Sequence, residues 1–184
     1  MKIDTAEVPS PIGTIALCWG DEGLCALEFE ARWSRIERAL ARRFGEVSLR
    51  RTADPGGVAR KLRAYFQGDL KALDEIEVDP GGTAFQREVW AALRRVPAGG
   101  TASYGDLARA IGRPKAVRAV GLANGANPVP VVVPCHRIIG ADGLLTGYGG
   151  GLRRKAWLLR HEGAAFRERR ARAPQPGLPF AAEA

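Results

Sequence analysis

The tetrapeptide Asp79-Pro80-Gly81-Gly82 constrains the fold more than any other feature of the sequence, because it interrupts both helices and strands. Charge also changes at this point. Residues 1–80 carry 12 Lys or Arg and 14 Asp or Glu, a net charge of −2, whereas residues 81–163 carry 12 and 4, a net charge of +8. The 184-residue chain is long enough for two small domains. We therefore predict domains over 1–80 and 81–163, followed by a flexible Arg-, Ala- and Pro-rich tail over 164–184.

The first domain has the pattern of a small α/β unit. Two apolar runs, Ile12–Cys18 and Leu24–Phe29, flank a Gly-rich turn, which is typical of a β-hairpin. Apolar residues at helical spacing predict helices over Trp33–Phe44 and Val58–Phe66. Glu75–Val78 could add a short strand.

The second domain is predicted to be mainly helical. Thr83 begins a helix and has Gln86 at the capping-box position. The β-branched run Val129–Val133 predicts a buried strand that ends at Pro134, and Arg153–His161 predicts a last helix.

Two short helices between these elements have the pattern of a helix-turn-helix. Ser103 and Asp106 form a capping pair for the first helix, and Gly112-Arg113-Pro114 is a tight break. Pro114 suits the start of a second helix, which we predict over Lys115–Asn124. A plain αα-hairpin has the same pattern, and a basic half can be simply a solvated surface. The two features together favour a polyanionic partner such as DNA.

Cysteine usage points to a reducing compartment. The chain has three cysteines and two histidines, and Cys18 and Cys25 lie far along the chain from both histidines. A disulfide framework or a zinc site therefore does not follow from the spacing, and we expect these two cysteines to be small buried hydrophobes. No apolar run approaches the ~18 residues of a membrane span, and the N-terminus lacks a secretory signal. We expect a cytoplasmic protein with no membrane partner.

Pro134-Cys135-His136-Arg137 is the strongest candidate for a chemical centre. A free thiol has a pKa of about 8.5, and a nearby histidine and basic groups would raise its thiolate fraction. Adjacent residues on a strand point to opposite faces, so Cys135 and His136 can cooperate only if the chain turns at Pro134. An inert core cysteine is the alternative that this tetrapeptide alone leaves open.

Five segments in order, FQREVW, SYGDLA, GRPKAVRAVGLANGANP, PVPVVVPCHRIIG and TGYGGGLRRKAWLLRHEG, give a family resemblance. Together they resemble the O6-alkylguanine-DNA alkyltransferases, or methylated-DNA–protein-cysteine methyltransferases, from Thr83 to Gly163. SPIGTIAL and LRAYFQG resemble the N-terminal domain of that family. The resemblance implies a ribonuclease-H-like α/β domain, with a small sheet and helices, and a mainly α, winged-helix-like domain with a helix-turn-helix.

The resemblance also implies catalytic roles. Cys135 would be the alkyl acceptor, His136 would activate it through a water molecule, and Glu162 would polarise His136. Tyr104 would hydrogen-bond the flipped guanine and help to rotate its phosphate. Without the family, a solvated carboxylate at Glu162 and a core aromatic at Tyr104 are the plainer interpretations.

Further residues are implied in DNA binding and in the base pocket. Arg118 would fill the gap left in the base stack, although a simple phosphate contact is the alternative. The other expected DNA-binding residues are Gln86, Tyr104, Lys115 and Ala116. The small residues expected to let the second helix approach a groove are Ala116, Ala119, Gly121 and Ala123. The expected base-pocket and structural residues are Asn127, Ile138, Tyr148, Gly149 and Gly150.

The expected function is irreversible, single-turnover transfer of the alkyl group from O6-alkylguanine to Cys135, with O4-methylthymine as a second substrate. The partner would be double-stranded DNA with alkylated bases, and the protein a monomer without metal or cofactor. Gly149 stands where some family members carry Ser or Ala, so one pocket contact would be missing. A lesion-binding protein without transfer and a Cys-His hydrolase are the competing interpretations; the presence of Cys135 opposes the first, and the helix-turn-helix opposes the second.

Overall fold

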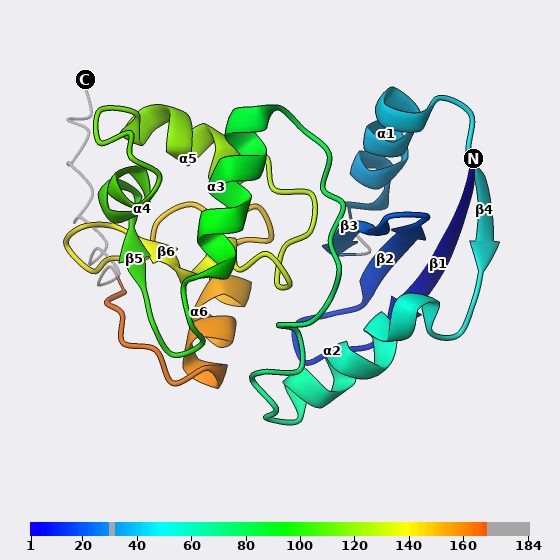
Figure 1. The fold of residues 1–184 in the computed structure, drawn as a ribbon. Coiled ribbons are helices and arrows are strands. Elements are labelled where there is room, and N and C mark those ends of the chain that lie inside the picture. Colours follow the sequence, from blue (N-terminus) through cyan, green and yellow to red (C-terminus); the bar gives the residue numbers. More distant parts are fainter. Residues whose placement is uncertain (30–31, 169–184) are drawn as a thin grey trace, which may run out of the picture.

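A computed structural model describes residues 1–29 and 32–168. A mixed sheet with two helices lies beside a mainly helical unit, and an extended segment crosses between them (Figure 1). The sheet has the order β3-β2-β1-β4; β1 pairs antiparallel with β2 and parallel with β4, and β2 pairs antiparallel with β3. The strands are β1 (Lys2–Val8), β2 (Ile15–Gly20), β3 (Gly23–Phe29) and β4 (Ser48–Arg51).

The predicted hairpin is present as β2 and β3, but β2 begins at Ile15 rather than Ile12. Two strands, β1 and β4, were not predicted; β4 is exposed at every residue and so has no alternation to detect. The predicted strand Glu75–Val78 is wrong. Only Val78 pairs, in an isolated bridge with Leu24, and Glu75 is the last residue of the turn before it.

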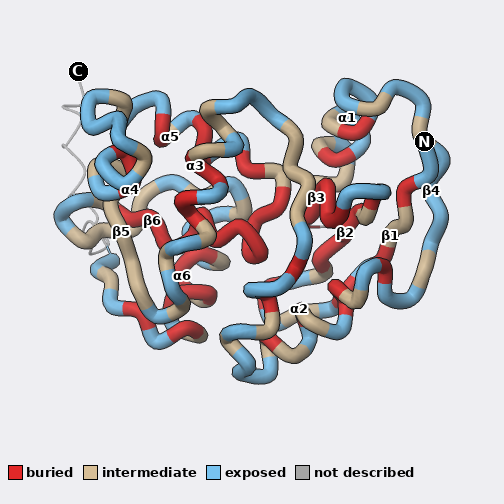
Figure 2. The backbone as a smooth tube through the Cα atoms, in the orientation of Figure 1, coloured by how far each residue is buried: buried red, intermediate tan, exposed pale blue. Residues whose placement is uncertain are grey.

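Helices cover both faces of the sheet, which explains why β2 and β3 are almost continuously apolar. The helix α1 (Trp33–Phe44) buries Ile36 and Leu40 in the cluster that contains Cys18 and Cys25. The helix α2 (Val58–Phe66) follows the 3-10 turn η2 (Pro55–Gly57) and packs in the main core. Figure 2 shows this buried core continuing from the sheet into the helical unit. Both helices have the predicted bounds.

The helical unit also has a two-stranded parallel sheet. Its elements are α3 (Ala84–Arg94), β5 (Ala102–Ser103), α4 (Tyr104–Ala110), α5 (Val117–Gly125), η3 (Cys135–Arg137), β6 (Ile138–Ile139) and α6 (Leu152–His161). The capping boxes predicted at Thr83 and Ser103 are both present. The helix α5 begins two residues later than predicted, because the Ala116 N–H bonds the Arg113 carbonyl at 2.9 Å and closes a turn there.

The predicted strand Val129–Val133 is wrong. The segment is a buried turn in which the Val133 N–H bonds the Val129 carbonyl at 2.9 Å, with an isolated bridge between Pro130 and Val133. Three prolines lie in or beside it: Pro128, Pro130 and Pro134. Each lacks the N–H that a central strand must donate, so the apolar run cannot form a ladder.

The first residues of the predicted tail are packed against the helical unit. Ala164 is buried, the Leu145 N–H bonds the Arg167 carbonyl at 3.0 Å, and Arg160 pairs with Glu168 at 2.7 Å. The prediction of a loose tail from residue 164 is therefore wrong for 164–168, and its remainder, 169–184, lies outside the described residues. Within the described residues, no helix has the length and apolar character needed to cross a membrane.

Candidate active site at the domain interface

A cavity of about 330 Å³ lies between the two units, and Cys135 lines it. Tyr104, Asn127 and Tyr148 line it from the helical unit. The first unit contributes three charged residues to the lining: Glu28, Arg32 and Arg35. The Arg32 guanidinium donates to the Gly149 carbonyl, and Arg35 donates to the Gly125 carbonyl at 3.2 Å, so both arginines tie the two units together beside Cys135.

The backbone turns sharply at the candidate nucleophile. Cys135 lies in the 3-10 helix η3 directly after Pro134, so it and His136 do not alternate across a strand. Asn127 holds the preceding turn: its Nδ2 donates to the Val133 carbonyl at 2.8 Å, and the Val129 N–H donates to its Oδ1 at 3.0 Å. The turn therefore has the change of direction that cooperation between Cys135 and His136 requires.

Backbone strain marks the same turn. Val131 has φ of 75° and is the only non-glycine with positive φ in the described residues. A β-branched residue in this region costs on the order of 1–3 kcal/mol, so the surrounding contacts must hold it there. The hydrogen bond that Asn127 donates, the one that it accepts and the burial of Val131 supply that constraint.

Burial is the largest influence on the Cys135 thiol. Burial raises its pKa to about 11, and the amide of Asn127 and the positive charge of Lys155 lower it only in part. Two neighbouring groups therefore favour the thiolate, but His136 is not one of them, and the net pKa shift favours the thiol. The cause is that Cys135 is 6% exposed, and burial outweighs the nearby polar groups.

Lys155 is a candidate site residue that the sequence analysis missed. Its side chain is buried, and Nζ donates to the carbonyls of Ile138 and Thr146, the latter at 2.9 Å. Burial lowers its pKa to about 8, and the neighbouring Cys135 acts in the opposite direction. A signal was present, since Lys155 lies three and four residues before Leu158 and Leu159 on the apolar face of α6.

His136 and Glu162 form a buried pair. His136 Nε2 lies 2.9 Å from Glu162 Oε1, and Arg137 donates to both oxygens of the same carboxylate, from Nε at 2.9 Å and from Nη2 at 2.8 Å. Burial alone would raise the pKa of Glu162, but the hydrogen bonds from His136 and Arg137 outweigh it and hold the pKa well below the usual range. Burial lowers the pKa of His136, although Glu162 opposes this.

The partners of His136 fix which ring nitrogen can act as a base. A carboxylate accepts hydrogen bonds and cannot donate them, so Nε2 must carry the proton that faces Glu162. The lone pair of a neutral ring is then on Nδ1. This atom is buried and has no hydrogen-bond partner within the described part of the chain.

The basic residues expected to meet DNA lie on α5 and in the turn before it: Arg118 is on the helix and Lys115 in the turn. Lys115 and Arg118 are exposed, and neither forms an ion pair within residues 1–29 and 32–168. Ala116 is half-buried at the N-cap, and Ala119 is exposed.

Two of the small residues on α5 lie next to neighbouring helices. The Tyr104 ring lies 3.8 Å from where a Cβ at position 121 would be, and Ala123 is buried with its carbonyl bonded to Trp90 Nε1 at 2.9 Å. The expectation that a small residue thins an exposed groove face is wrong for Ala123, which is buried against α3. Gly121 is half-buried, and a side chain there would meet Tyr104 at an ordinary contact distance.

Gly149 and Gly150 line the cavity beside Tyr148. A Cβ at position 150 would lie 2.4 Å from the Phe29 ring, so only glycine fits there. At position 149 a Cβ would lie 3.1 Å from the Arg32 guanidinium, which already donates to this carbonyl. The buried Tyr148 hydroxyl has no partner within the described residues, whereas the Tyr104 hydroxyl lies 3.4 Å from Thr146 Oγ1.

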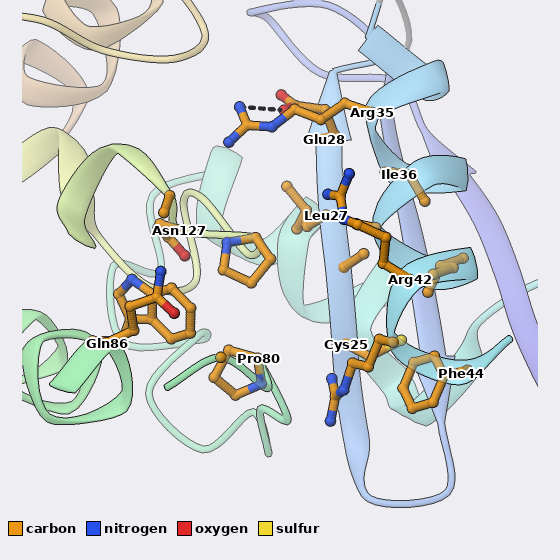
Figure 3. A pocket seen from close by; sticks show the side chains of 18 residues that line it. Cys25, Leu27, Glu28, Arg35, Ile36, Arg42, Phe44, Pro80, Gln86 and Asn127 are labelled. Atoms are coloured by element: carbon orange, nitrogen blue, oxygen red, sulfur yellow. Dashed lines mark hydrogen bonds and ion pairs between the residues drawn. The ribbon is translucent and has the colours of Figure 1, made fainter. Parts of the chain in front are cut away.

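Several expected site residues do not line the Cys135 cavity: His136, Glu162, Lys115, Ala116, Arg118, Ile138 and Gln86. Ile138 is fully buried in β6, where its carbonyl accepts from Lys155. The Gln86 side chain accepts the Thr83 N–H at 2.9 Å and lines a separate groove of about 560 Å³ (Figure 3). Neither residue lines the cavity beside Cys135.

The fold and this site define a two-domain protein whose second domain carries a helix-turn-helix beside a buried cysteine. Residues 6–80 match the ribonuclease-like domain of 6-O-methylguanine DNA methyltransferase, and residues 84–164 match its DNA binding domain. The chain belongs to the 6-O-methylguanine DNA methyltransferase family.

Relatives over most of the chain agree with this assignment. The chain is similar to the methylated-DNA–protein-cysteine methyltransferase of Salmonella typhimurium, with 49% identity over 89% of this chain and 97% of the relative. The enzyme of that name from Methanosarcina acetivorans is 46% identical over 84% of this chain and 95% of the relative. The crystal structure of Mycobacterium tuberculosis O6-methylguanine methyltransferase is similar, with 42% identity, a TM-score of 0.70, and coverage of 88% of this chain and 93% of that one. A structure of the M. tuberculosis protein in complex with DNA has a TM-score of 0.70 and 43% identity, and covers 89% of this chain and 93% of that one.

Proposed function

We propose that this protein repairs DNA by direct reversal: it takes the alkyl group of O6-alkylguanine in double-stranded DNA onto Cys135, once per molecule. The observation that carries the proposal is the position of Cys135 in a cavity between the domains that Tyr104 and Gly121 of the helix-turn-helix also line. The next residue in the chain, His136, pairs with the buried Glu162. The damaged carbon lies inside a duplex, so the base must leave the stack, at a cost on the order of a few kcal/mol.

The reaction is an in-line displacement at a saturated carbon. A bond forms between Cys135 Sγ and the alkyl carbon, while the bond from that carbon to guanine O6 breaks. The thiol proton passes through a water molecule to Nδ1 of His136, whose other nitrogen is held by Glu162. Tyr104 donates to the guanine, which offsets the charge that develops as the purine leaves. The product is a thioether without a carbonyl to polarise, so the protein is not regenerated.

The DNA face is α5 with the turn before it. Lys115 and Arg118 are exposed there, and Arg118 fills the gap that the flipped base leaves. If Arg118 is a wedge, Arg118→Ala slows transfer from duplex DNA more than from a single-stranded substrate. An ordinary phosphate contact would instead weaken binding to every sequence and reduce the salt dependence by about one unit. Equal defects on the two substrates reject the wedge.

Finer parts of the proposal concern substrates and organisation. We place O4-methylthymine among the substrates, treat the protein as a cytoplasmic monomer, and divide it into domains over 1–80 and 81–163. Three free cysteines fit a reducing compartment. The strands β5 and β6 beside α4 support a winged-helix-like second domain.

Intact-mass measurement tests the proposed function. Limiting protein is mixed with excess duplex that contains O6-methylguanine, repaired lesions are counted, and the added methyl group is located by peptide mass mapping. We expect one methyl group per protein, on Cys135, with Cys135→Ser as a binding-competent control that gains none. Repair well beyond one lesion per molecule, or a methyl group at another residue, would overturn the mechanism. No gain with retained binding would indicate a lesion-binding protein, and turnover of a carbonyl substrate a Cys-His hydrolase.

A further inference from the structure

The first domain contributes one hydroxyl to the buried pair in the second. Tyr65, on α2, is fully buried, and its hydroxyl donates to Glu162 Oε1 at 2.7 Å. The rest of the residue is fixed from the second domain as well. His161 Nε2 lies 2.7 Å from the Tyr65 carbonyl, and the two rings meet edge to face with centroids 5.0 Å apart. The hydroxyl therefore has little freedom to choose another partner.

Three donors converge on one oxygen of Glu162. The Tyr65 hydroxyl at 2.7 Å, Arg137 Nη2 at 2.8 Å and His136 Nε2 at 2.9 Å all face Oε1, whereas only Arg137 Nε, at 2.9 Å, faces Oε2. A carboxylate oxygen has two lone-pair directions, so three donors compete for its electron density. Each bond that Tyr65 or Arg137 makes to Oε1 weakens the acceptor that His136 uses.

We propose that Tyr65 is a positioning residue for the proposed reaction: it shares Glu162 Oε1 with His136 and so keeps the imidazole a neutral base with its lone pair on Nδ1. The inference rests on the proposed function only in taking His136 as the proton acceptor. An imidazole that did not share the carboxylate with Tyr65 would hold a second proton more tightly. A larger fraction of His136 would then be protonated at a given pH, and a protonated ring cannot accept the proton of Cys135.

The charged groups around the pair act in the same direction. Arg137 from η3 and Lys155 from α6 both lower the pKa of His136, after burial, and Glu162 is the group that raises it. Glu162 in turn raises the pKa of the Tyr65 hydroxyl, after burial, so this hydroxyl remains a donor at any physiological pH.

Packing alone does not explain why residue 65 carries a hydroxyl group on its ring. Arg137 already gives the carboxylate two hydrogen bonds and an opposite charge, so Glu162 would be satisfied without help from α2. Phenylalanine would keep the ring contacts with Phe66 and His161. Tyrosine adds the hydrogen bond from its hydroxyl to Glu162. Because Tyr65 belongs to the first domain, the proton affinity of His136 then depends on how that domain docks.

Nuclear magnetic resonance of the two histidines tests the proposal in the full-length, DNA-free protein. With ¹⁵N-labelled histidine, the chain gives only the signals of His136 and His161, which a His161→Asn variant assigns. We expect His136 in the Nε2–H form, and Tyr65→Phe to raise its pKa by about half to one unit. The matched control is Tyr148→Phe, which removes a buried hydroxyl that does not contact Glu162. An unchanged His136 pKa in folded Tyr65→Phe overturns the proposal.

A second measurement keeps the test decisive if Tyr65→Phe does not fold. Incorporation of 3-fluorotyrosine makes each phenol a stronger donor, so the pKa of His136 should move down, opposite to the Phe variant. A shift of the same sign, or none, rejects the competition for Oε1.

The pH profile of single-turnover transfer separates positioning from structure. Tyr65→Phe should move the acid limb to higher pH and keep the plateau within a few fold, whereas a merely structural role would lower the plateau without moving the limb. Failure of the wild-type protein to methylate Cys135 would reject the proposed function instead, whatever the histidine signals do.

Discussion

Cys135 in the second domain and Cys25 in the first are alike in the properties most often used to find a reactive thiol. Cys25 is 4% exposed and Cys135 6%, and burial raises the pKa of each to about 11. Both line a cavity, and that of Cys25, about 560 Å³ (Figure 3), is larger than the 330 Å³ beside Cys135. Burial, pKa and cavity size therefore do not identify the nucleophile.

The two thiols differ in the polar groups that surround them. Cys25 lies on the regular strand β3, and its Sγ donates to the Cys18 carbonyl at 3.2 Å on the neighbouring strand. Its side chain lies close to Phe44 in Figure 3, and it packs in the cluster that also holds Ile36 and Leu40.

Cys135 lies instead on a strained turn within reach of buried polar groups. The amide of Asn127 and the charge of Lys155 lower the pKa of its thiol. His136, the next residue in the chain, pairs with the buried Glu162. In the proposed reaction these groups take a proton or hold a charge.

The largest expected difference concerns transfer itself. Cys135→Ser should reduce methyl transfer from O6-methylguanine DNA by more than about a thousandfold, because an alcohol is a far weaker nucleophile than a thiol. Cys25→Ala should still accept one methyl group per molecule and should lose on the order of 1–2 kcal/mol of stability through the small cavity it leaves. Intact mass after reaction and urea denaturation measure both. Methylation at Cys25 in the Cys135→Ser variant would remove the distinction between the two thiols.

The next effect is on stability. Asn127→Ala should reduce the free energy of unfolding by about 2–4 kcal/mol, because it leaves the Val129 N–H without a partner and releases the strained Val131. It also removes one of the two hydrogen bonds to the Val133 carbonyl, which still accepts the Cys135 N–H at 2.8 Å. The control on the groove beside Cys25 is Gln86→Ala, which removes one capping bond and should cost only about 0.5–1 kcal/mol. Equal losses in thermal or urea denaturation would show that the turn is held by packing alone.

The contrast between the thiols also explains how far the sequence could predict the site. Local patterns sufficed for α1, α2 and the two capping boxes, because propensity, spacing and caps agree there. The strand prediction for Val129–Val133 was wrong because its β-branched residues favour a strand, while the neighbouring prolines lack the N–H groups that a strand must donate. The strand β4 was not predicted because its residues are all exposed and form no apolar face.

Site residues divide in the same way. Cys135, His136, Tyr104 and Tyr148 lie in short motifs, so a family resemblance places them together. Tyr65 could not be predicted, because it meets Glu162 across 97 residues of sequence and only after the two domains dock. Its pattern on α2 is that of an ordinary core tyrosine.

A smaller effect is expected on the rate at which each thiol is alkylated, because a different positive charge acts on each of them. Lys155→Met should raise the pKa of Cys135 above its value of about 11 and slow its alkylation by iodoacetamide at a given pH up to about tenfold, with no change at Cys25. Arg43→Met should raise the pKa of Cys25 and slow its alkylation, with no change at Cys135, because Arg43 lowers the pKa of Cys25. Alkylation at several pH values, with each thiol quantified by peptide mass mapping, gives both profiles. A change at both thiols in either variant would mean that the substitution loosened the fold.

The smallest expected effect is on the pH dependence of stability above pH 9. The folded pKa of Cys25, about 11, exceeds its unfolded value of 9, so the folded state binds more protons between these values and stability falls as pH rises. Cys135 contributes the same fall. Lys155 contributes the opposite sign, because its folded pKa of about 8 lies below the unfolded 10.5, and stability rises with pH between the two.

The two opposed groups should therefore cancel between pH 9 and 10.5. A double variant, Cys135→Ala with Lys155→Met, should leave the slope of unfolding free energy against pH unchanged in this interval. Cys25→Ala should make the slope less negative by up to about 1.4 kcal/mol per pH unit, since no lysine opposes that thiol. Urea denaturation at intervals from pH 8.5 to 10.5 measures the slopes. If the double variant flattens the slope as much as Cys25→Ala does, Lys155 is not buried with its charge beside Cys135, and the polar surroundings that distinguish the two thiols are not as described.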